Sequence, residues 1–418
     1  MSVEEPTEVV VLGGGYTAIW AARALARGLR RPLRDGSVRV TVVSATTAHA
    51  FHGWTGEVLS GHVRGERART ALVDVVPPAW VLHGCASALD PVARTVSVTT
   101  DDGVRLLPYD HLLVATGSRD ARERVPGLVE HGWSLKDDGG LDALVGRLEA
   151  GCGTAVVVGG GLAGTEAAVA LAARLRREEP DARVVLVHGG ERVLPDLRPR
   201  FERVARYAVE QAERAGVAIR CGIRVARVDE DGVALEDGTT IPAGTVVSAV
   251  GQVVVTLPGL AAERAADGRL VVDRRLRTTL DGVWSGGDAA AVPHPNGSGP
   301  CPPNALWAIK AGTRAGRNIA RTVRGRRARV FRFPGLGQAA SLGVGRGAAE
   351  LYGVQLTGWV AWLTRWVFFH AFMPSRRIAL AAMRDWLVLG LRTAGGRRAV
   401  ADATHGVVSN TGTLDAAV

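Results

Sequence analysis

Cysteine is scarce in this chain, with four among 418 residues. Cys85, Cys152, Cys221 and Cys301 are far apart and form no Cys-x-x-Cys pair. This spacing argues against a disulfide framework and against a thiolate metal site. Because disulfides are rare in reducing compartments, the composition leads us to expect a cytoplasmic protein without a structural metal ion.

Lysine is scarcer still. Lys136 and Lys310 are the only lysines, so arginine carries almost all of the positive charge behind the formal net charge of +10. No nucleic-acid motif and no basic–aromatic stripe accompanies this charge. The sequence therefore predicts a solvated, arginine-rich surface and no nucleic-acid partner.

Long apolar runs are also missing. The two most apolar stretches near the C-terminus, 358–373 and 377–391, are shorter than the roughly 20 uninterrupted residues that cross a bilayer. Arg365 and Arg384 interrupt them. A membrane-spanning helix is therefore not expected in this chain.

Two glycine turns dominate what is present. Residues 9–18 and their near-copy at 155–164 each read as an apolar strand, a glycine turn and the start of an alanine-rich helix. The amides and the positive dipole end of such a helix point at the turn, where a pyrophosphate typically binds. Two such turns indicate a protein that holds two dinucleotides and passes hydride from one to the other.

The repeat continues beyond the turns, which favours an internal duplication over chance. In each half a second strand follows, then a hairpin around Asp-Gly, then an apolar strand that ends on glycine. The paired segments are 38–43 and 182–187, 96–107 and 233–241, and 112–117 and 246–251.

This layout predicts an α/β protein with two Rossmann-like dinucleotide-binding domains, one inserted in the other, plus a C-terminal strand and amphipathic helices. The first domain is expected to be discontinuous, over 1–119 and 245–330. The inserted domain is expected over 120–244. Residues 331–418 are expected to cover the side on which an electron acceptor or a membrane surface binds.

Three segments together resemble the FAD signature of the flavoproteins with two dinucleotide-binding domains: Gly13-x-Gly15-x-x-Ala18, Ala115-Thr116-Gly117 and Gly286-Gly287-Asp288. The resemblance covers nearly the whole chain and implies that the first domain binds FAD. Ser44 stands where an acid usually holds the adenosine ribose. The residues expected to hold FAD are Gly13, Gly15, Tyr16, Thr17, Ala18, Ser44, Ala115, Thr116, Gly117, Gly287, Asp288 and Ala289.

The second turn looks like the pyridine-nucleotide motif of the same superfamily. Glu166 matches the position whose carboxylate contacts the nicotinamide end in related enzymes, although a first-turn carboxylate can also simply complement the helix dipole. His188 stands where NADH users commonly have an acid, so both NADH and NADPH stay open, with Arg192 a partner for a 2′-phosphate. The residues expected to hold the nucleotide are Gly159, Gly161, Leu162, Ala163, Gly164, His188 and Gly251.

The resemblance implies that hydride passes directly from the nicotinamide to the flavin, so the protein has to stack the two rings and exclude water. No side-chain acid or base is needed for that step. The absence of a Ser-His-Asp set and of paired catalytic carboxylates is consistent with this chemistry.

The acceptor is suggested by two further segments. His49–Trp54 and Pro303–Gly312 resemble parts of the type II NADH:quinone oxidoreductases, whose quinone motif carries two glutamines. Here Leu306 and Lys310 stand in their places. Leu306 and Trp307 are expected to form an acceptor pocket, with Lys310, like Glu166, a catalytic residue. The alternative is that Trp307 packs in the core as an ordinary helix residue and that Lys310 is a surface cation. A quinone or a similar small acceptor is the predicted partner.

The C-terminal third resembles the same family. Its Trp- and Phe-rich stretch 358–373 and the following stretch 377–391 have arginines on their flanks, a composition typical of helices that lie in a membrane interface. A helical hairpin packed on the core or at a homodimer contact is the alternative. We expect a cytoplasmic protein that binds the inner face of the cell membrane peripherally.

Several other functions compete with this interpretation. No cysteine lies in 42–62, which argues against a disulfide reductase, and the isolated Cys301 makes a sulfide:quinone oxidoreductase a weak alternative. A flavoprotein reductase with an electron-carrier protein or a specialised small molecule as acceptor stays open. So does a redox-weakened FAD-binding module, because Ser44, His188 and the two replaced glutamines depart from the family pattern.

Overall fold

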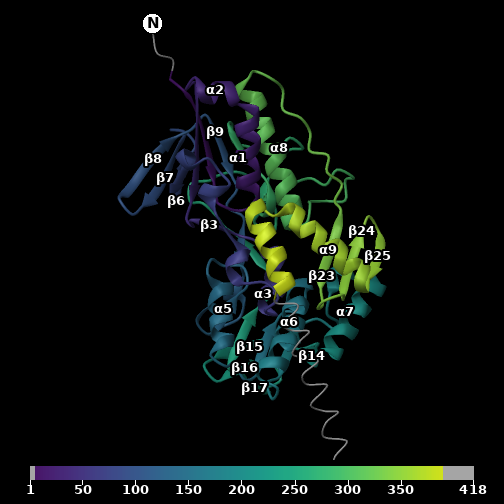
Figure 1. The fold of residues 1–418 in the computed structure, drawn as a ribbon. Coiled ribbons are helices and arrows are strands. Elements are labelled where there is room, and N and C mark those ends of the chain that lie inside the picture. The colour runs from purple at the N-terminus through teal and green to yellow at the C-terminus, as the bar shows by residue number, and fades with distance from the viewer. Residues whose placement is uncertain (1–4, 389–418) are drawn as a thin grey trace, which may run out of the picture.

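The computed structural model describes residues 5–388. Two five-stranded parallel sheets form the upper and lower parts of the molecule in Figure 1, and the C-terminal helices lie across the junction between them. The end of the predicted stretch 377–391 and the C-terminal part of the region 331–418 lie outside the described residues. The α/β class with two Rossmann-like units is confirmed.

The first sheet is built around the strand that precedes the first glycine turn. Val9 and Val11 are fully buried, as expected for a parallel strand covered on both faces. In spatial order its strands are β21 (Val283–Ser285), β9 (His111–Val114), β1 (Thr7–Leu12), β2 (Val38–Ser44) and β5 (Val81–His83).

Helices α1 (Tyr16–Gly28) and α8 (Ala305–Val323) run side by side against this sheet. Two glycines of α8 permit their close approach. A Cβ on Gly312 would lie 2.2 Å from the carbonyl oxygen of Thr17, and one on Gly316 would lie 2.4 Å from that of Ala21. This packing holds the N-terminal end of α8 beside the first glycine turn.

The second sheet repeats the arrangement around the second glycine turn. Its strands, in order, are β11 (Gly132–Ser134), β18 (Thr245–Ser248), β12 (Ala155–Val158), β13 (Val184–His188) and β14 (Val217–Cys221). Helices α6 (Leu162–Glu178) and α7 (Glu202–Arg214) pack on it. Strand β18 pairs with β11 and β12, so this sheet extends past the expected boundary at residue 244.

Both Asp-Gly hairpins are present, as β7–β8 and β16–β17. They belong to three-stranded antiparallel sheets, and a third such sheet follows α8. Their strands are β6 (Cys85–Asp90), β7 (Thr95–Thr100) and β8 (Gly103–Pro108); β15 (Val225–Asp229), β16 (Gly232–Leu235) and β17 (Thr240–Pro242); and β23 (Gly337–Ser341), β24 (Gly347–Leu351) and β25 (Val354–Thr357).

The remaining elements are short and connect or flank these sheets. The helices are α2 (Arg30–Arg34), α3 (Thr55–Leu59), α4 (Leu128–His131) and α5 (Gly140–Glu149). The strand pairs are β3 (Ala48–Ala50) with β4 (Arg69–Ala71), β10 (Ser118–Asp120) with β19 (Gln252–Val254), and β20 (Leu270–Val271) with β22 (Ala290–Ala291).

The C-terminal helices lie on the surface of this assembly. Helix α9 (Gly358–Phe372) is followed by a helix that begins at 376 and is described as far as 388. Within the described residues, no helix combines the length and the apolarity that a bilayer span requires. The side chain of Arg365, which interrupts the apolar stretch 358–373, points inward, and only 3% of it is exposed.

Candidate functional site

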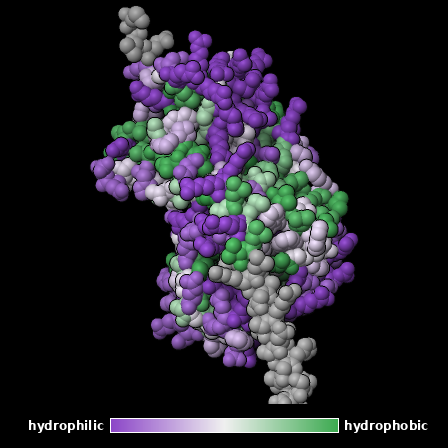
Figure 2. Space-filling view, viewed as in Figure 1, coloured by the Kyte–Doolittle hydropathy of each residue, from purple (hydrophilic) through white to green (hydrophobic). Residues whose placement is uncertain are grey.

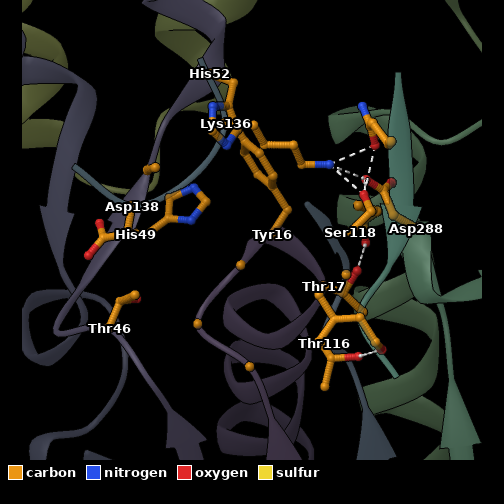
Figure 3. Close-up of a pocket in the computed structure, with 18 of the residues that line it drawn as sticks. Tyr16, Thr17, Thr46, His49, His52, Thr116, Ser118, Lys136, Asp138 and Asp288 are labelled. Carbon is orange, nitrogen blue, oxygen red and sulfur yellow. Dashed lines mark hydrogen bonds and ion pairs between the residues drawn. The ribbon is translucent and has the colours of Figure 1, made fainter. Parts of the chain in front are cut away.

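One cavity of about 650 Å³ lies where the two sheets meet. The first unit contributes the glycine turn Gly13–Gly15, Thr116 and Asp288 to its wall, and the second unit contributes Ala163 and Glu166 of α6. Figure 3 shows its polar groups, with the loop before α1 running between them. The cavity therefore touches both glycine-turn units.

Two glycines of the first turn are needed for different reasons, Gly13 for its backbone conformation and Gly15 for the open space in front of it. Gly13 has φ +121°, and a Cβ there would lie 2.3 Å from the carbonyl oxygen of Ala115. Gly15 has φ −83°, and a Cβ there would meet nothing within 4 Å. Gly15 precedes α1 without a side-chain cap, so backbone amides face the open space. This cradle fits a dinucleotide pyrophosphate.

The second turn has the same construction. Gly159 has φ +117°, and a Cβ on Gly164 would lie 1.9 Å from the carbonyl oxygen of Gly159. Gly161, the uncapped residue before α6, has φ −74° and open space in front of it. The second turn therefore also fits a pyrophosphate, and Gly164 permits the close packing of helix on strand.

A polar network crosses the cavity wall between the two units. Lys136 Nζ lies 3.2 Å from Asp288 Oδ2 and 2.6 Å from Gln252 Oε1, and it also bonds Ser118 Oγ. Ser118 Oγ lies 2.7 Å from the Asp288 carboxylate. These groups meet to the right of Tyr16 in Figure 3. They provide an ammonium group and a carboxylate beside the space that the glycine turns open.

Aromatic and imidazole rings line the cavity beside this network. Tyr16 and His49 meet edge to face, with their ring centroids 4.4 Å apart. Burial lowers the pKa of His49 to about 3 and that of His52 to about 4, so both rings are neutral near pH 7. A wall of neutral rings is suited to a planar, weakly polar group such as a flavin or nicotinamide ring.

Glu166 is held by a buried ion triad. Arg365 of α9 reaches Glu166 Oε1 of α6 at 2.5 Å and Glu57 Oε1 of α3 at 2.6 Å, and it donates to the carbonyl oxygen of Gly53 at 3.0 Å. The amide of Ser341 donates to Glu166 Oε1 at 3.1 Å. The triad thus joins both units and the C-terminal region at the edge of the cavity.

The triad predicts a pH-dependent stability. Burial raises the pKa of Glu166 from 4.5 to about 7, an effect that Arg365 opposes and Glu57 reinforces. Because the folded-state pKa exceeds the unfolded one, the contribution of this group is fully present below pH 4.5 and is lost as the pH rises through about 7. We expect the melting temperature of the parent protein to fall more steeply between about pH 5 and about pH 8 than that of Glu166→Gln. Identical slopes in the two proteins would show that Glu166 does not titrate in this range.

Most of the residues that the sequence singled out meet at this cavity. Those that line it are Gly13, Gly15, Tyr16, Thr17, Ser44, Ala115, Thr116, Gly117, Ala163, Glu166, Gly251 and Asp288. Those that do not line it are Ala18, Gly159, Gly161, Leu162, Gly164, His188, Gly287 and Ala289, together with the three residues of the expected acceptor pocket.

The expected acceptor pocket of Leu306, Trp307 and Lys310 is not formed at this cavity. Trp307 is buried against Phe331 and Phe333, and the Lys310 ammonium lies 5.6 Å from the Phe333 and Phe372 ring centroids. The helix period explains the difference, because positions three apart share a face. The face of α8 that lines the cavity is the one with Ala305 and Ala308.

The sequence interpretation missed Arg365 and Glu57 as site residues, and it gave Lys136 no role. An arginine inside a Trp- and Phe-rich helix was a usable signal, because a charge on such a helix usually has a buried partner. Nothing in the sequence identified that partner, since Glu57 and Glu166 are 308 and 199 positions away.

Two glycine-turn units that face one cavity define a class of oxidoreductase that binds two dinucleotides. The chain belongs to the pyridine nucleotide-disulphide oxidoreductase family, whose pattern it matches over residues 7–312. The protein is therefore an FAD- and NAD(P)H-dependent oxidoreductase. The match spans both glycine turns and Asp288.

Relatives of known sequence and structure are consistent with this membership. An "NADH dehydrogenase-like protein" of Mycobacterium tuberculosis is 34% identical over an alignment of 305 positions, which covers 68% of this chain and 73% of the relative. The type II NADH:quinone oxidoreductase NdhA of the same species is 26% identical and covers 94% of this chain and 89% of the relative. The structure of NDH2 from Plasmodium falciparum in complex with NADH has a TM-score of 0.79 at 14% identity, with 91% and 97% of the two chains covered.

Proposed function

We propose that the protein oxidises NAD(P)H and passes the electrons through FAD to a quinone or a similar small acceptor. The single observation that carries this proposal is the cavity lined both by the first glycine turn and by Glu166 of the second unit. FAD, when bound, accepts hydride from the nicotinamide ring and transfers electrons onward. Both rings must reach the same space, and this cavity provides it.

In this proposal the protein binds and orients the two cofactors and excludes water from their rings. The amides before α1 and α6 hold the two pyrophosphates, and Asp288 accepts hydrogen bonds from cofactor hydroxyls. Lys136 places a positive charge beside Asp288. The neutral rings of Tyr16 and His52 provide a partly dry wall, which strengthens the electrostatic interactions inside the cavity.

Glu166 is proposed to contact the nicotinamide end of the nucleotide. Its carboxylate lines the cavity, yet Arg365 and the Ser341 amide hold it in one orientation. A carboxyl group restrained in this way can receive the nicotinamide carboxamide without first losing conformational freedom. The role of Glu166 is therefore positioning of the ring that donates hydride.

An anaerobic experiment tests the function as a whole. NADH or NADPH is expected to bleach the flavin absorbance at about 450 nm, and a soluble quinone is expected to restore it. Failure of both nucleotides to bleach the flavin would contradict the dehydrogenase activity. Bleaching without recovery would leave the dehydrogenase activity in place and make an electron-carrier protein or another small molecule the acceptor, as the missing glutamines at Leu306 and Lys310 also allow.

The C-terminal helices are proposed to bind the inner face of the cell membrane. Figure 2 shows apolar side chains gathered on the face formed by α9 and the helix after it. Exposed members include Trp359, Val367, Leu380 and Leu387, with exposed fractions of 53% to 68%. Arg376 and Arg377 are exposed at the start of the second helix. Apolar side chains with arginines beside them are typical of an interfacial membrane site.

We expect Trp359→Arg to reduce co-sedimentation with vesicles that contain anionic lipid by at least about fivefold. The substitution removes one tryptophan side chain that anchors the helix at the membrane interface. Val92→Arg, at a 94% exposed position between β6 and β7, serves as the matched control and is expected to bind vesicles like the parent. Unchanged vesicle binding together with a fall from dimer to monomer mass would instead assign this face to a homodimer contact.

A further inference from the structure

The second nucleotide site lacks an acid at the place that usually reads the adenosine ribose. His188 is the last residue of β13, and Gly189 and Gly190 follow it. In dinucleotide sites an acid at this strand end accepts hydrogen bonds from the ribose hydroxyls and repels a 2′-phosphate. Its replacement by histidine removes that repulsion.

The imidazole of His188 is fixed against the glycine turn. The amide of Gly160 donates to His188 Nδ1 at 3.3 Å, so Nδ1 is an acceptor and the ring proton is on Nε2. A Cβ on Gly190 would lie 2.9 Å from Nε2, which shows that the ring folds over the loop after the strand. His188 therefore offers an N–H donor at the strand end.

An arginine lies beside the same loop. A Cβ on Gly189 would lie 2.8 Å from Cγ and 3.4 Å from Nε of Arg224, so this side chain runs along the Gly189 backbone. The amide of Gly222 donates to the carbonyl oxygen of Gly190 at 2.8 Å and fixes the segment that carries Arg224. Arg224 is exposed, and within residues 5–388 it forms no ion pair.

Arg192, the arginine that the sequence suggested as a phosphate partner, is already engaged. Its guanidinium lies 2.5 Å from Glu202, which also pairs with Arg198. Glu191 is the other carboxylate of this loop, and the amide of Glu236 donates to the carbonyl oxygen of Arg224 at 3.0 Å. Neither carboxylate forms an ion pair with Arg224 within residues 5–388, so its guanidinium is available to an anion.

We propose that the second nucleotide site selects NADPH over NADH, with Arg224 binding the 2′-phosphate of the adenosine ribose and His188 lining the same subsite. The proposal rests on the function proposed above and names its electron donor. A guanidinium can bind phosphate through two parallel hydrogen bonds, which makes the contact both strong and specific. Gly189 and Gly190 carry no side chains, so Arg224 and His188 both lie directly against the backbone at this strand end.

Redox-inert fragments test this specificity without relying on hydride transfer. We expect the FAD-loaded protein to bind 2′-phospho-ADP-ribose at least about tenfold more tightly than ADP-ribose in titration calorimetry. ADP-ribose lacks the 2′-phosphate and therefore lacks one charge-assisted contact. Arg224→Ala is expected to remove most of that preference while affinity for ADP-ribose stays unchanged. His188→Glu, which restores the acid, is expected to reverse the preference. Arg203→Ala, at an exposed position on α7, is the matched control and is expected to behave like the parent.

The outcomes separate this proposal from the function on which it rests. Equal binding of the two fragments, or tighter binding of ADP-ribose, would overturn NADPH selection and leave the second nucleotide site intact. Binding of neither fragment would overturn the nucleotide site itself and the selection with it. A tenfold preference that survives Arg224→Ala would overturn the role of that residue.

Discussion

Replacing Arg365 by methionine is expected to lower the free energy of unfolding by about 3–5 kcal/mol, because it leaves two buried carboxylates without their counter-ion. Glu57 and Arg365 have side chains only 3% exposed, and that of Glu166 is 15% exposed. Glu57 therefore cannot reach water without a local rearrangement, and Glu166 reaches it only in part, where it lines the cavity. Urea unfolding at neutral pH measures the loss.

Two further variants show whether the loss comes from the ion triad. Arg384→Ala changes an exposed arginine of the following helix and is expected to alter stability by less than about 0.5 kcal/mol. Glu57→Gln in the Arg365→Met background removes one stranded charge and is expected to restore part of the lost stability. If Arg365→Met unfolds at the same urea concentration as the parent, the triad does not stabilise the fold.

Alanine substitutions at Gly15 and Gly161 are expected to affect the binding of the two cofactors separately. Gly15 and Gly161 have negative φ and no atom within 4 Å of an added Cβ, so alanine strains neither turn. The added methyl group would occupy the space through which a pyrophosphate approaches the backbone. We expect Gly15→Ala to be purified with little FAD. Gly161→Ala is expected to retain FAD but to bind NAD(P)H at least about tenfold more weakly.

The ratio of flavin to protein absorbance and the nucleotide dissociation constant measure the two effects. Gly146→Ala, at an exposed position of helix α5 with open space around it, is the matched control and is expected to be neutral or slightly stabilising. An unchanged flavin content in Gly15→Ala would mean that the first turn does not hold FAD. Equal nucleotide affinity in Gly161→Ala and the parent would contradict the assignment of the second turn.

The glycine turns were predictable because their signals are local. The strand, turn and helix around Gly13 and around Gly159 occupy about ten consecutive residues, and each needs only backbone conformation and apolar patterning to be recognised. The Asp-Gly hairpins at β7–β8 and β16–β17 were predictable for the same reason. Asp288 also lies where its glycine-rich segment indicated, on the wall of the cavity.

The roles of Lys310 and Arg365 were not predictable in the same way. Both are basic residues in helical segments, and their surroundings in the sequence are similarly apolar. Packing puts the Lys310 ammonium near two phenylalanine rings on the side of α8 away from the cavity, whereas Arg365 meets two carboxylates beside it. The rotational setting of each helix decides between these environments, and that setting depends on neighbours far away in the chain.

By itself, the sequence determined the α/β class and the duplicated dinucleotide-binding unit, and it singled out twelve of the residues that line the cavity. Each of these depends on spacing within one segment, where the backbone geometry is known in advance. Only the tertiary structure decided that Arg365 holds both Glu166 and Glu57, that Leu306, Trp307 and Lys310 lie off the cavity, and that Arg224 lies against Gly189, next to His188 in the chain. Those facts join segments from different elements, and their relative positions follow from the packing of the whole chain.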